Sequence, residues 1–466
     1  MAAPDSIPPL AHTLLRRDFL KLGALGLTLP QFLSLSATGQ NASGGGFGQA
    51  KSCIVLFAWG GISHLDTWDP KPEAPREIRG EFRTIGTSVP GVRIGEHTPL
   101  IAKQMHRMAL VRSVHHRAPS HRSAAYWNLT GHEPPNLSGN WPATRADWPC
   151  IGSMVAAAKG GGRGGRALPN AVALPYPMAD GGKANGQDGG FLGLAYDPAI
   201  FRPSRGELYD GVSPTSGHID LNLPPGIDPS RATARRRLLG EISDQSIIGS
   251  PSDTSTFVES RESAMEMLLS PEVRKAFDLD LEPRRVREAY GDHICGQSVL
   301  LARRLSEAGV PLTTVYCAAG DLNGSVGDHF DTHAQNFKRL REGMLPPLDR
   351  ASSALLEDLH QRGRLEDTLV CWLTEFGRTP KINRGAGRDH FPNCYSVAFA
   401  GAGIRGGQVY GRSNAIGYEP AELGCGPADL HATIFHALGI DPHHVIHDQA
   451  DRPFPLCDGK ALPLFG

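Results

Sequence analysis

Acidic and histidine side chains follow four short apolar runs in this 466-residue sequence. Each run is continuous, which is typical of a strand buried on both faces of a sheet. The carboxyl ends of parallel strands meet at one edge of a sheet, so we expect the side chains after them to lie together. The four runs are residues 52–58, 108–114, 313–317 and 369–374.

The side chains that follow these runs are those that bind divalent metals. Imidazole and carboxylate groups form the ligand set expected for Zn²⁺, Mn²⁺ or a similar ion. One Asp-x-His pair would be weak evidence, because an aspartate such as Asp331 before a helical run can simply cap the helix. Four groups at one edge instead predict a metal site, and they comprise His64, Asp66 and Asp69; His115, His116 and His121; Asp331 and His333; and Glu375, Asp389 and His390.

Helical patterns alternate with the apolar runs and indicate the fold. A fifth apolar run covers residues 396–400, and helices are predicted at 98–105, 297–308, 336–361 and 428–438. This alternation predicts an α/β fold with a doubly wound, mostly parallel sheet. We expect one domain over residues 51–466, with a loop-rich insertion at about 159–251, where Gly and Pro are frequent.

The composition excludes several classes of protein. With 40% hydrophobic residues the chain can bury a large core, and a net charge of −1 argues against a nucleic-acid partner. Its 8 cysteines form no C-x-x-C motif, so zinc-finger and haem-attachment sites are not predicted, and no disulfide pairing can be assigned. The absence of a dinucleotide fingerprint argues against an oxidoreductase.

The first 50 residues predict export. Arg16-Arg17-Asp18-Phe19-Leu20-Lys21 precedes a moderately apolar stretch and then small residues, and this run resembles a twin-arginine signal. We therefore expect a signal peptide at 1–37, a Gly-rich linker at 38–50, and recognition by the twin-arginine translocase. The expected location is periplasmic or extracellular. The apolar stretch is too short for a stable membrane span, although a retained anchor is the alternative.

Four motifs together resemble the DUF1501 family of largely uncharacterised exported bacterial proteins, which is related to the alkaline phosphatase and sulfatase superfamily. The resemblance covers nearly the whole chain. A fifth segment, beginning Pro427-Ala428-Asp429-Leu430, is similar to a helix common in sulfatases. The four motifs span residues 60–72, 330–333, 374–380 and 387–390.

The resemblance implies an alkaline phosphatase-like sheet that carries one or two divalent ions (zinc, manganese, magnesium or calcium). It implies hydrolysis of sulfate or phosphate esters, with Arg378 holding an anionic oxygen through its planar guanidinium group. Together with the clusters above, it gives the predicted metal ligands His64, Asp66, Asp331, His333, Glu375, Asp389 and His390.

The sulfatase nucleophile segment is altered in this chain. Counting back from Thr130-Gly131 places His121 at the nucleophile position, whereas aligning on Pro119-Ser120 places Arg117 there. Neither residue is a cysteine, so a formylglycine sulfatase is not expected. Three mechanisms remain: attack by a metal-bound hydroxide, a metal-activated Ser120 or Ser123, or acid–base catalysis by His121. We favour the hydroxide with help from His121.

These features predict an exported metallohydrolase of anionic esters. Its substrate is expected to be a small anionic ester or a sulfated or phosphorylated polymer. The alternative is a secreted binding protein that keeps the fold without catalysis, which the altered segment at residues 117–123 makes plausible.

Overall fold

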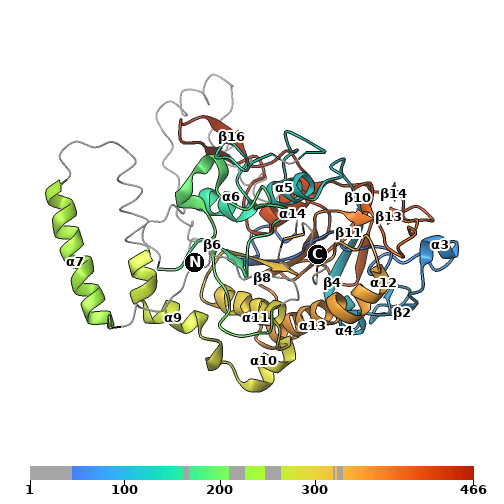
Figure 1. Cartoon of the computed structure of the whole chain (residues 1–466), viewed down its shortest axis with the longest axis horizontal. Coiled ribbons are helices and arrows are strands. Elements are labelled where there is room, and N and C mark those ends of the chain that lie inside the picture. The colour runs from blue at the N-terminus through green and yellow to red at the C-terminus, as the bar shows by residue number, and fades with distance from the viewer. Residues whose placement is uncertain are drawn as a thin grey trace, which may run out of the picture.

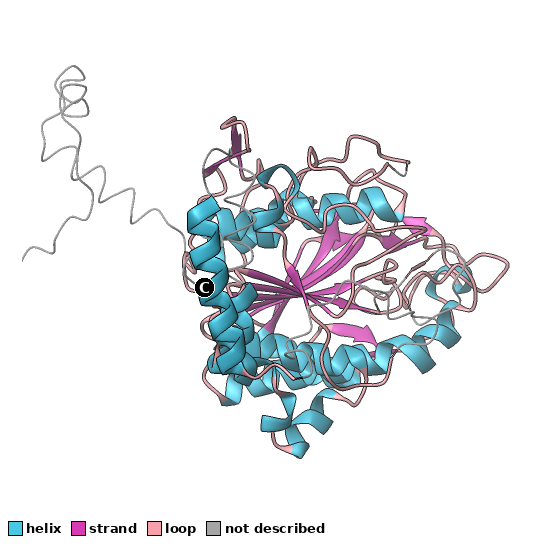
Figure 2. Cartoon of the chain, turned by 60° about the vertical axis from the view of Figure 1, so that its left-hand side comes forward, coloured by secondary structure: helices cyan, strands magenta, loops and turns pink. Residues whose placement is uncertain are grey.

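A central sheet lies between two layers of helices in the computed structural model, which describes residues 45–139, 141–160, 167–208, 226–246, 264–318, 321–322 and 329–466 (Figures 1 and 2). Within these residues the sheet has 8 strands in the order β12-β4-β11-β8-β1-β7-β5-β6. Their bounds are β1 Ser52–Ala58, β4 Met108–Val114, β5 Ala171–Leu174, β6 Ala199–Ile200, β7 Leu312–Cys317, β8 Thr368–Thr374, β11 Tyr395–Ala400 and β12 Gln408–Tyr410.

The strands that precede the predicted site run in one direction. β1 pairs in parallel with β7 and β8, and Ala58 lies beside both Cys317 and Thr374. β11 is antiparallel to β8 and to β4, so β4 has the same direction as β8. The carboxyl ends of β1, β4, β7 and β8 therefore meet at one edge, as the sequence predicted.

Alternate residues of β1 enter two different cores, which is the pattern of a sheet covered on both faces. Val55 and Phe57 pack in the core that holds residues of α5, α6 and α14. Ile54 and Leu56 pack in the core that holds residues of α4, α11 and α13. The helices are α3 Arg76–Arg79, α4 Pro99–Gln104, α5 His121–Thr130, α6 Ile151–Ala158, α7 Pro229–Ser246, α9 Pro271–Phe277, α10 Arg284–Tyr290, α11 Ile294–Glu307, α12 Asn336–Arg339, α13 Leu345–Gln361 and α14 Pro427–Ala437.

The loops outside the central sheet form short two-stranded sheets. The β9–β10 pair matters most, because it brings His390 opposite Arg378. Their strands are β2 Thr84–Gly86, β3 Arg93–Gly95, β9 Gly377–Arg378, β10 His390–Phe391, β13 Arg412–Ser413, β14 Pro420–Glu422, β15 Val445–His447 and β16 Pro453–Pro455.

Three details differ from the sequence prediction. The stretch 159–251 supplies β5 and β6 to the central sheet, and β5 was missed because it is only four residues long. β11 runs antiparallel, which an apolar run cannot reveal. The helix predicted at 336–361 is interrupted by a π-helix at Leu340–Met344, after which α13 begins with Pro346 and Pro347 in its first turn. Proline is tolerated there because the first backbone N–H groups of a helix have no partner within it.

No helix in the described part of the chain is both long and apolar enough to cross a membrane. The predicted signal peptide and most of the predicted linker lie outside the described residues. All 8 cysteines are buried free thiols.

Candidate metal centre

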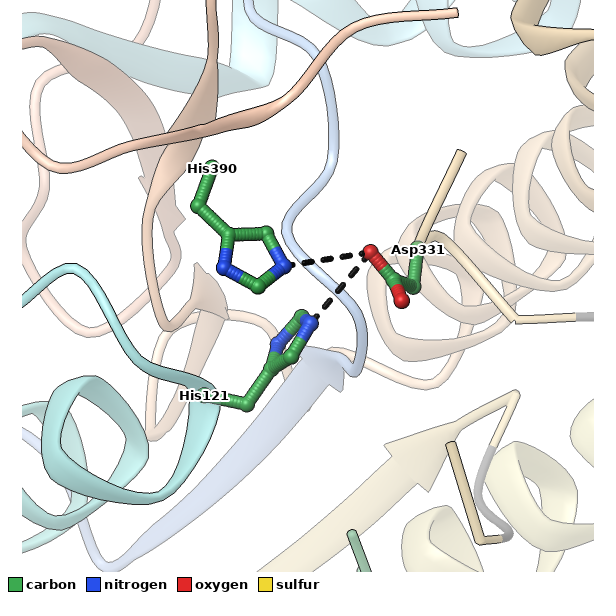
Figure 3. Close-up of side chains that lie close together, drawn as sticks. All are labelled: His121, Asp331 and His390. Carbon is green, nitrogen blue, oxygen red and sulfur yellow. Dashed lines mark hydrogen bonds and ion pairs between the residues drawn. The ribbon is translucent and has the colours of Figure 1, made fainter. Parts of the chain in front are cut away.

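Three side chains from distant parts of the chain point toward one another at the carboxyl edge of the sheet (Figure 3). His121 is the first residue of α5, Asp331 follows β7, and His390 begins β10. One ligand atom from each lies within 4.8 Å of the others. The loops after the strands thus bring together three side chains that are far apart in the sequence.

The Oδ1 atom of Asp331 is the centre of this group. It lies 3.3 Å from Nε2 of His121, 3.2 Å from Nε2 of His333 and 3.3 Å from Nε2 of His390. The Nε2 atoms of His333 and His390 are themselves 2.9 Å apart. Three imidazole rings therefore turn the same nitrogen toward one carboxylate oxygen.

The opposite nitrogen of each ring contacts a hydrogen-bond acceptor. Nδ1 of His121 lies 2.8 Å from Oε1 of Glu375, and Nδ1 of His333 lies 2.7 Å from Oδ1 of Asp389. Nδ1 of His390 lies 2.9 Å from the carbonyl oxygen of Pro119. These acceptors favour a proton on each Nδ1, so each ring that gives up its second proton turns an Nε2 lone pair toward the centre of the group. Lone pairs that converge in this way fit a divalent cation, whose histidine ligands are usually held by a carboxylate or carbonyl.

Glu375 supports His121 from behind. It directly follows β8 and is fully buried, and its Oε1 also accepts the Gly60 backbone N–H at 2.8 Å. Its backbone carbonyl accepts hydrogen bonds from His116 Nε2 at 2.7 Å and Asn128 Nδ2 at 2.8 Å. The sequence suggested that Glu375 is a metal ligand, whereas the structure places it against the far side of a candidate ligand.

The cluster shifts the pKa values of its members in opposite directions. Burial alone would raise the pKa of Asp331, but hydrogen bonds from His121, His333 and His390 and the charge of Arg378 hold it well below its usual range. Burial lowers the pKa of His390 to about 4, which Asp331 only partly opposes. Burial also lowers the pKa of His121, but Asp331 and Glu375 outweigh it and raise the pKa overall.

The family model for DUF1501, described as a protein of unknown function, matches residues 50–464. The chain belongs to the DUF1501 family. No individually curated protein matches the sequence.

Solved structures similar to this DUF1501 protein include three described as follows. Ps i-CgsB has 10% identity, a TM-score of 0.40, and coverage of 87% of this chain and 74% of the other. The PsFucS1 sulfatase from Pseudoalteromonas sp. has 13% identity, a TM-score of 0.35, and coverage of 89% and 72%. The phosphonate monoester hydrolase SpPMH from Silicibacter pomeroyi has 14% identity, a TM-score of 0.35, and coverage of 88% and 76%.

Arg378 of this DUF1501 protein does not face solvent, although the sequence predicted a guanidinium that holds an anionic oxygen. The side chain is fully buried. It donates hydrogen bonds to Gly61 O at 2.9 Å, Arg388 O at 3.1 Å and Asp331 Oδ1 at 2.6 Å, and also to Gly60 O. Arg378 therefore anchors Asp331 and closes the loop after β1.

Asp66 and His64 lie outside the converging group, contrary to the prediction that they are ligands. Asp66 is fully buried in a two-point ion pair with Arg388, at 2.8 and 3.1 Å. Its Oδ2 also accepts hydrogen bonds from Ser63 Oγ at 2.6 Å and Asn336 Nδ2 at 2.8 Å. Nε2 of His64 lies 2.9 Å from Gly417 O. Both residues therefore have structural partners in place of a metal.

The two candidate serines differ in their surroundings. Ser123 is fully buried and directs its hydroxyl at the backbone oxygens of Leu137, at 2.6 Å, and Ser120, at 3.1 Å. The Ser123 hydroxyl therefore contacts backbone oxygens and does not point to a substrate. Ser120 is half-buried at the N-cap of α5 and makes no capping hydrogen bond there, so its hydroxyl remains available beside His121.

Sequence reasoning missed the residues that position the cluster. The sequence marked His116, but not its hydrogen bond to the Glu375 carbonyl. Asn128, Pro119 and Arg388 were missed as supports, because a single amide, carbonyl or arginine carries no spacing signal. The Gly387-Arg388-Asp389-His390 motif was the available hint, because Arg388 directly precedes Asp389 and His390 in it.

Proposed function

We propose that this DUF1501 protein is an exported, metal-dependent hydrolase of sulfate or phosphate esters. The convergence of three Nε2 atoms on Asp331 Oδ1, with every Nδ1 atom held by an acceptor, supports the metal. The motif resemblance to the alkaline phosphatase and sulfatase superfamily supports the choice of anionic esters. The run Arg16-Arg17 supports export.

The residues that would hold the ion are His121, Asp331, His333 and His390. Three imidazoles and one carboxylate favour zinc or manganese over magnesium or calcium, which prefer all-oxygen ligands. When bound, such a cation lowers the pKa of a coordinated water and polarises an ester oxygen.

The protein groups around the candidate metal position have different roles. Arg378 holds Asp331 at 2.6 Å, and Glu375 holds His121 at 2.8 Å, so both candidate ligands are fixed before any ligand arrives. The side chains of His333 and Asp389 are 46% and 53% exposed, in contrast to His121 at 4%. An ester therefore approaches from the His333 side, and His121 forms the buried floor.

The alternative function, a secreted binding protein without catalysis, also has an observation in its favour. The hydroxyl of Ser123 and the guanidinium of Arg378 are both committed to protein partners. Ester hydrolysis without either group leaves water or the Ser120 hydroxyl as the nucleophile. The two functions therefore differ in turnover and agree in metal binding.

Elemental analysis of the purified protein, together with chromogenic sulfate and phosphate esters, tests the proposal. We expect at least one bound transition-metal ion per chain, and we expect Asp331→Asn to lose ester turnover. The matched control is Asp228→Asn, an exposed aspartate on the N-terminal side of α7. Metal without turnover would favour the binding protein, and a metal-free protein would reject both. Normal export of the double variant Arg16→Lys, Arg17→Lys would reject the twin-arginine route.

A further inference from the structure

A cavity of about 480 Å³ is formed by α5, by the segment between α5 and α6, and by the loop after β5. Arg122, which directly follows His121 in α5, forms part of its wall. The segment between α5 and α6 contributes Arg145, and the loop after β5 contributes Gly182, Lys183 and Asp188. We call this the Arg122 cavity.

Arg122 contributes a fixed positive charge to this cavity. Its Nε and one terminal nitrogen donate to the carbonyl oxygen of Asp180, at 2.9 and 2.5 Å. These bonds fix the guanidinium but leave its charge uncompensated. Among the residues that the structure describes, no carboxylate oxygen lies within 4.0 Å of the Arg122 guanidinium.

The other two cations of the cavity already have partners. Lys183 lies 3.2 Å from Asp188, and Arg145 lies 2.6 Å from Asp197 in a two-point pair. These pairs are partly exposed, so each is weak and can rearrange around an incoming anion. The excess positive charge in the cavity therefore belongs to Arg122.

A glycine keeps the guanidinium accessible. A Cβ atom at Gly182 would lie 2.8 Å from a terminal nitrogen of Arg122, and the φ angle there is +142°. Only glycine adopts this backbone conformation readily. The loop can therefore lie against Arg122 without a side chain covering it.

We propose that the Arg122 cavity binds a second anionic group, a sulfate or a phosphate, of the substrate whose reacting ester lies at the metal centre. The inference rests on the proposed function and extends it to substrates that carry at least two anionic groups. A fixed guanidinium is suited to such a group because its planar donors match two oxygens at once. Arg122 directly follows His121 in α5, so the Cα atoms of the two residues lie about 3.8 Å apart and a molecule that contacts both side chains can be small.

Binding measurements with simple bivalent probes test this. The probes are the monosulfate and bis-sulfate of hexanediol and the corresponding phosphates, titrated calorimetrically into the metal-loaded protein. We expect the bis-ester to bind about 10-fold more tightly than the monoester, because the second contact is intramolecular. Arg122→Gln should remove this preference, and a larger preference for the sulfate or the phosphate pair identifies the group.

Two further variants sharpen the result. Lys183→Glu adds a carboxylate at the exposed rim of the cavity and should also reduce the preference for the bis-ester. Because Lys183 is exposed, this variant is less prone to unfold than a variant of the half-buried Arg122. Arg117→Gln is the control, since Arg117 is exposed and pairs with Glu133 at 2.6 Å. An equal preference in wild type, Arg122→Gln and Lys183→Glu would overturn the inference.

Failure of the metal proposal leaves a different signature. If no metal is involved, the monosulfate should bind equally well with and without a chelator. Loss of that binding in Arg122→Gln would then still support the cavity. If both esters bind only when metal is present, and Arg122→Gln changes neither affinity, the cavity proposal is rejected and the metal centre is retained.

Discussion

The Nδ1 atom of His121 lies 2.8 Å from Oε1 of Glu375, although 254 residues separate the two in sequence. Glu375 is fully buried and also accepts the Gly60 backbone N–H, so its carboxylate is held by the loop after β1 and by the first residue of α5. A buried carboxylate needs such partners, because an unpaired charge in the interior is costly. The pair turns the other nitrogen of His121 toward Asp331.

We predict that Glu375→Gln weakens metal binding by about 10- to 100-fold, the usual effect of losing a carboxylate behind a histidine ligand. The amide keeps the shape but removes the charge that favours a proton on Nδ1. Competition with a chromogenic chelator measures the change. The control is Glu366→Gln at an exposed position. Unchanged affinity in Glu375→Gln would show that His121 needs no such support.

Asp66→Asn should have the opposite profile. Asp66 was a predicted ligand, but it forms a fully buried pair with Arg388 at 2.8 Å. We expect normal metal content and a loss of unfolding free energy of about 3–5 kcal/mol, because Arg388 would remain buried without its partner. Urea denaturation and elemental analysis of the same preparation check both parts. Reduced metal content in a variant that keeps wild-type stability would restore Asp66 to the ligand set.

Arg378→Met should also destabilise the protein strongly. Its guanidinium contacts three backbone carbonyls and Asp331, all in the interior. Removing it leaves the Asp331 carboxylate without its ion pair at 2.6 Å, and we expect a loss of about 3–5 kcal/mol in metal-free protein. Arg412→Met is the matched control, since the Arg412–Glu422 pair is exposed and should contribute little to stability. A smaller loss in the metal-loaded protein would show that the cation compensates Asp331.

The sequence was sufficient to predict the sheet edge but not the inner arrangement of the site. Four apolar runs with acids and histidines after them correspond to β1, β4, β7 and β8, because buried parallel strands leave a strong local pattern. Whether a given acid meets a metal or an arginine depends on contacts across the fold. Asp66 and Asp331 have similar sequence surroundings, yet Asp66 pairs with Arg388 and Asp331 meets three histidines. No local pattern distinguishes these two outcomes.

The last prediction concerns acid sensitivity away from the candidate metal centre. His431 is fully buried in α14, and burial lowers its pKa from 6.5 to about 4, which its contact with the Asn128 carbonyl only partly opposes. The folded protein therefore binds fewer protons than the unfolded chain between pH 6.5 and about pH 4. Stability from this group is complete above pH 6.5 and is lost as the pH falls toward 4.

For one histidine with this shift, the loss between pH 7 and pH 5 is about 2 kcal/mol. His431→Gln keeps a donor for the Asn128 carbonyl but cannot take up a proton, so its unfolding free energy should fall less over this interval. Urea denaturation at pH 7 and pH 5, with a chelator throughout, separates this effect from acid release of a metal. His443→Gln, at an exposed position, should retain the wild-type pH dependence. Equal pH dependence in wild type and His431→Gln would mean that His431 is not the neutral, buried group that its surroundings indicate.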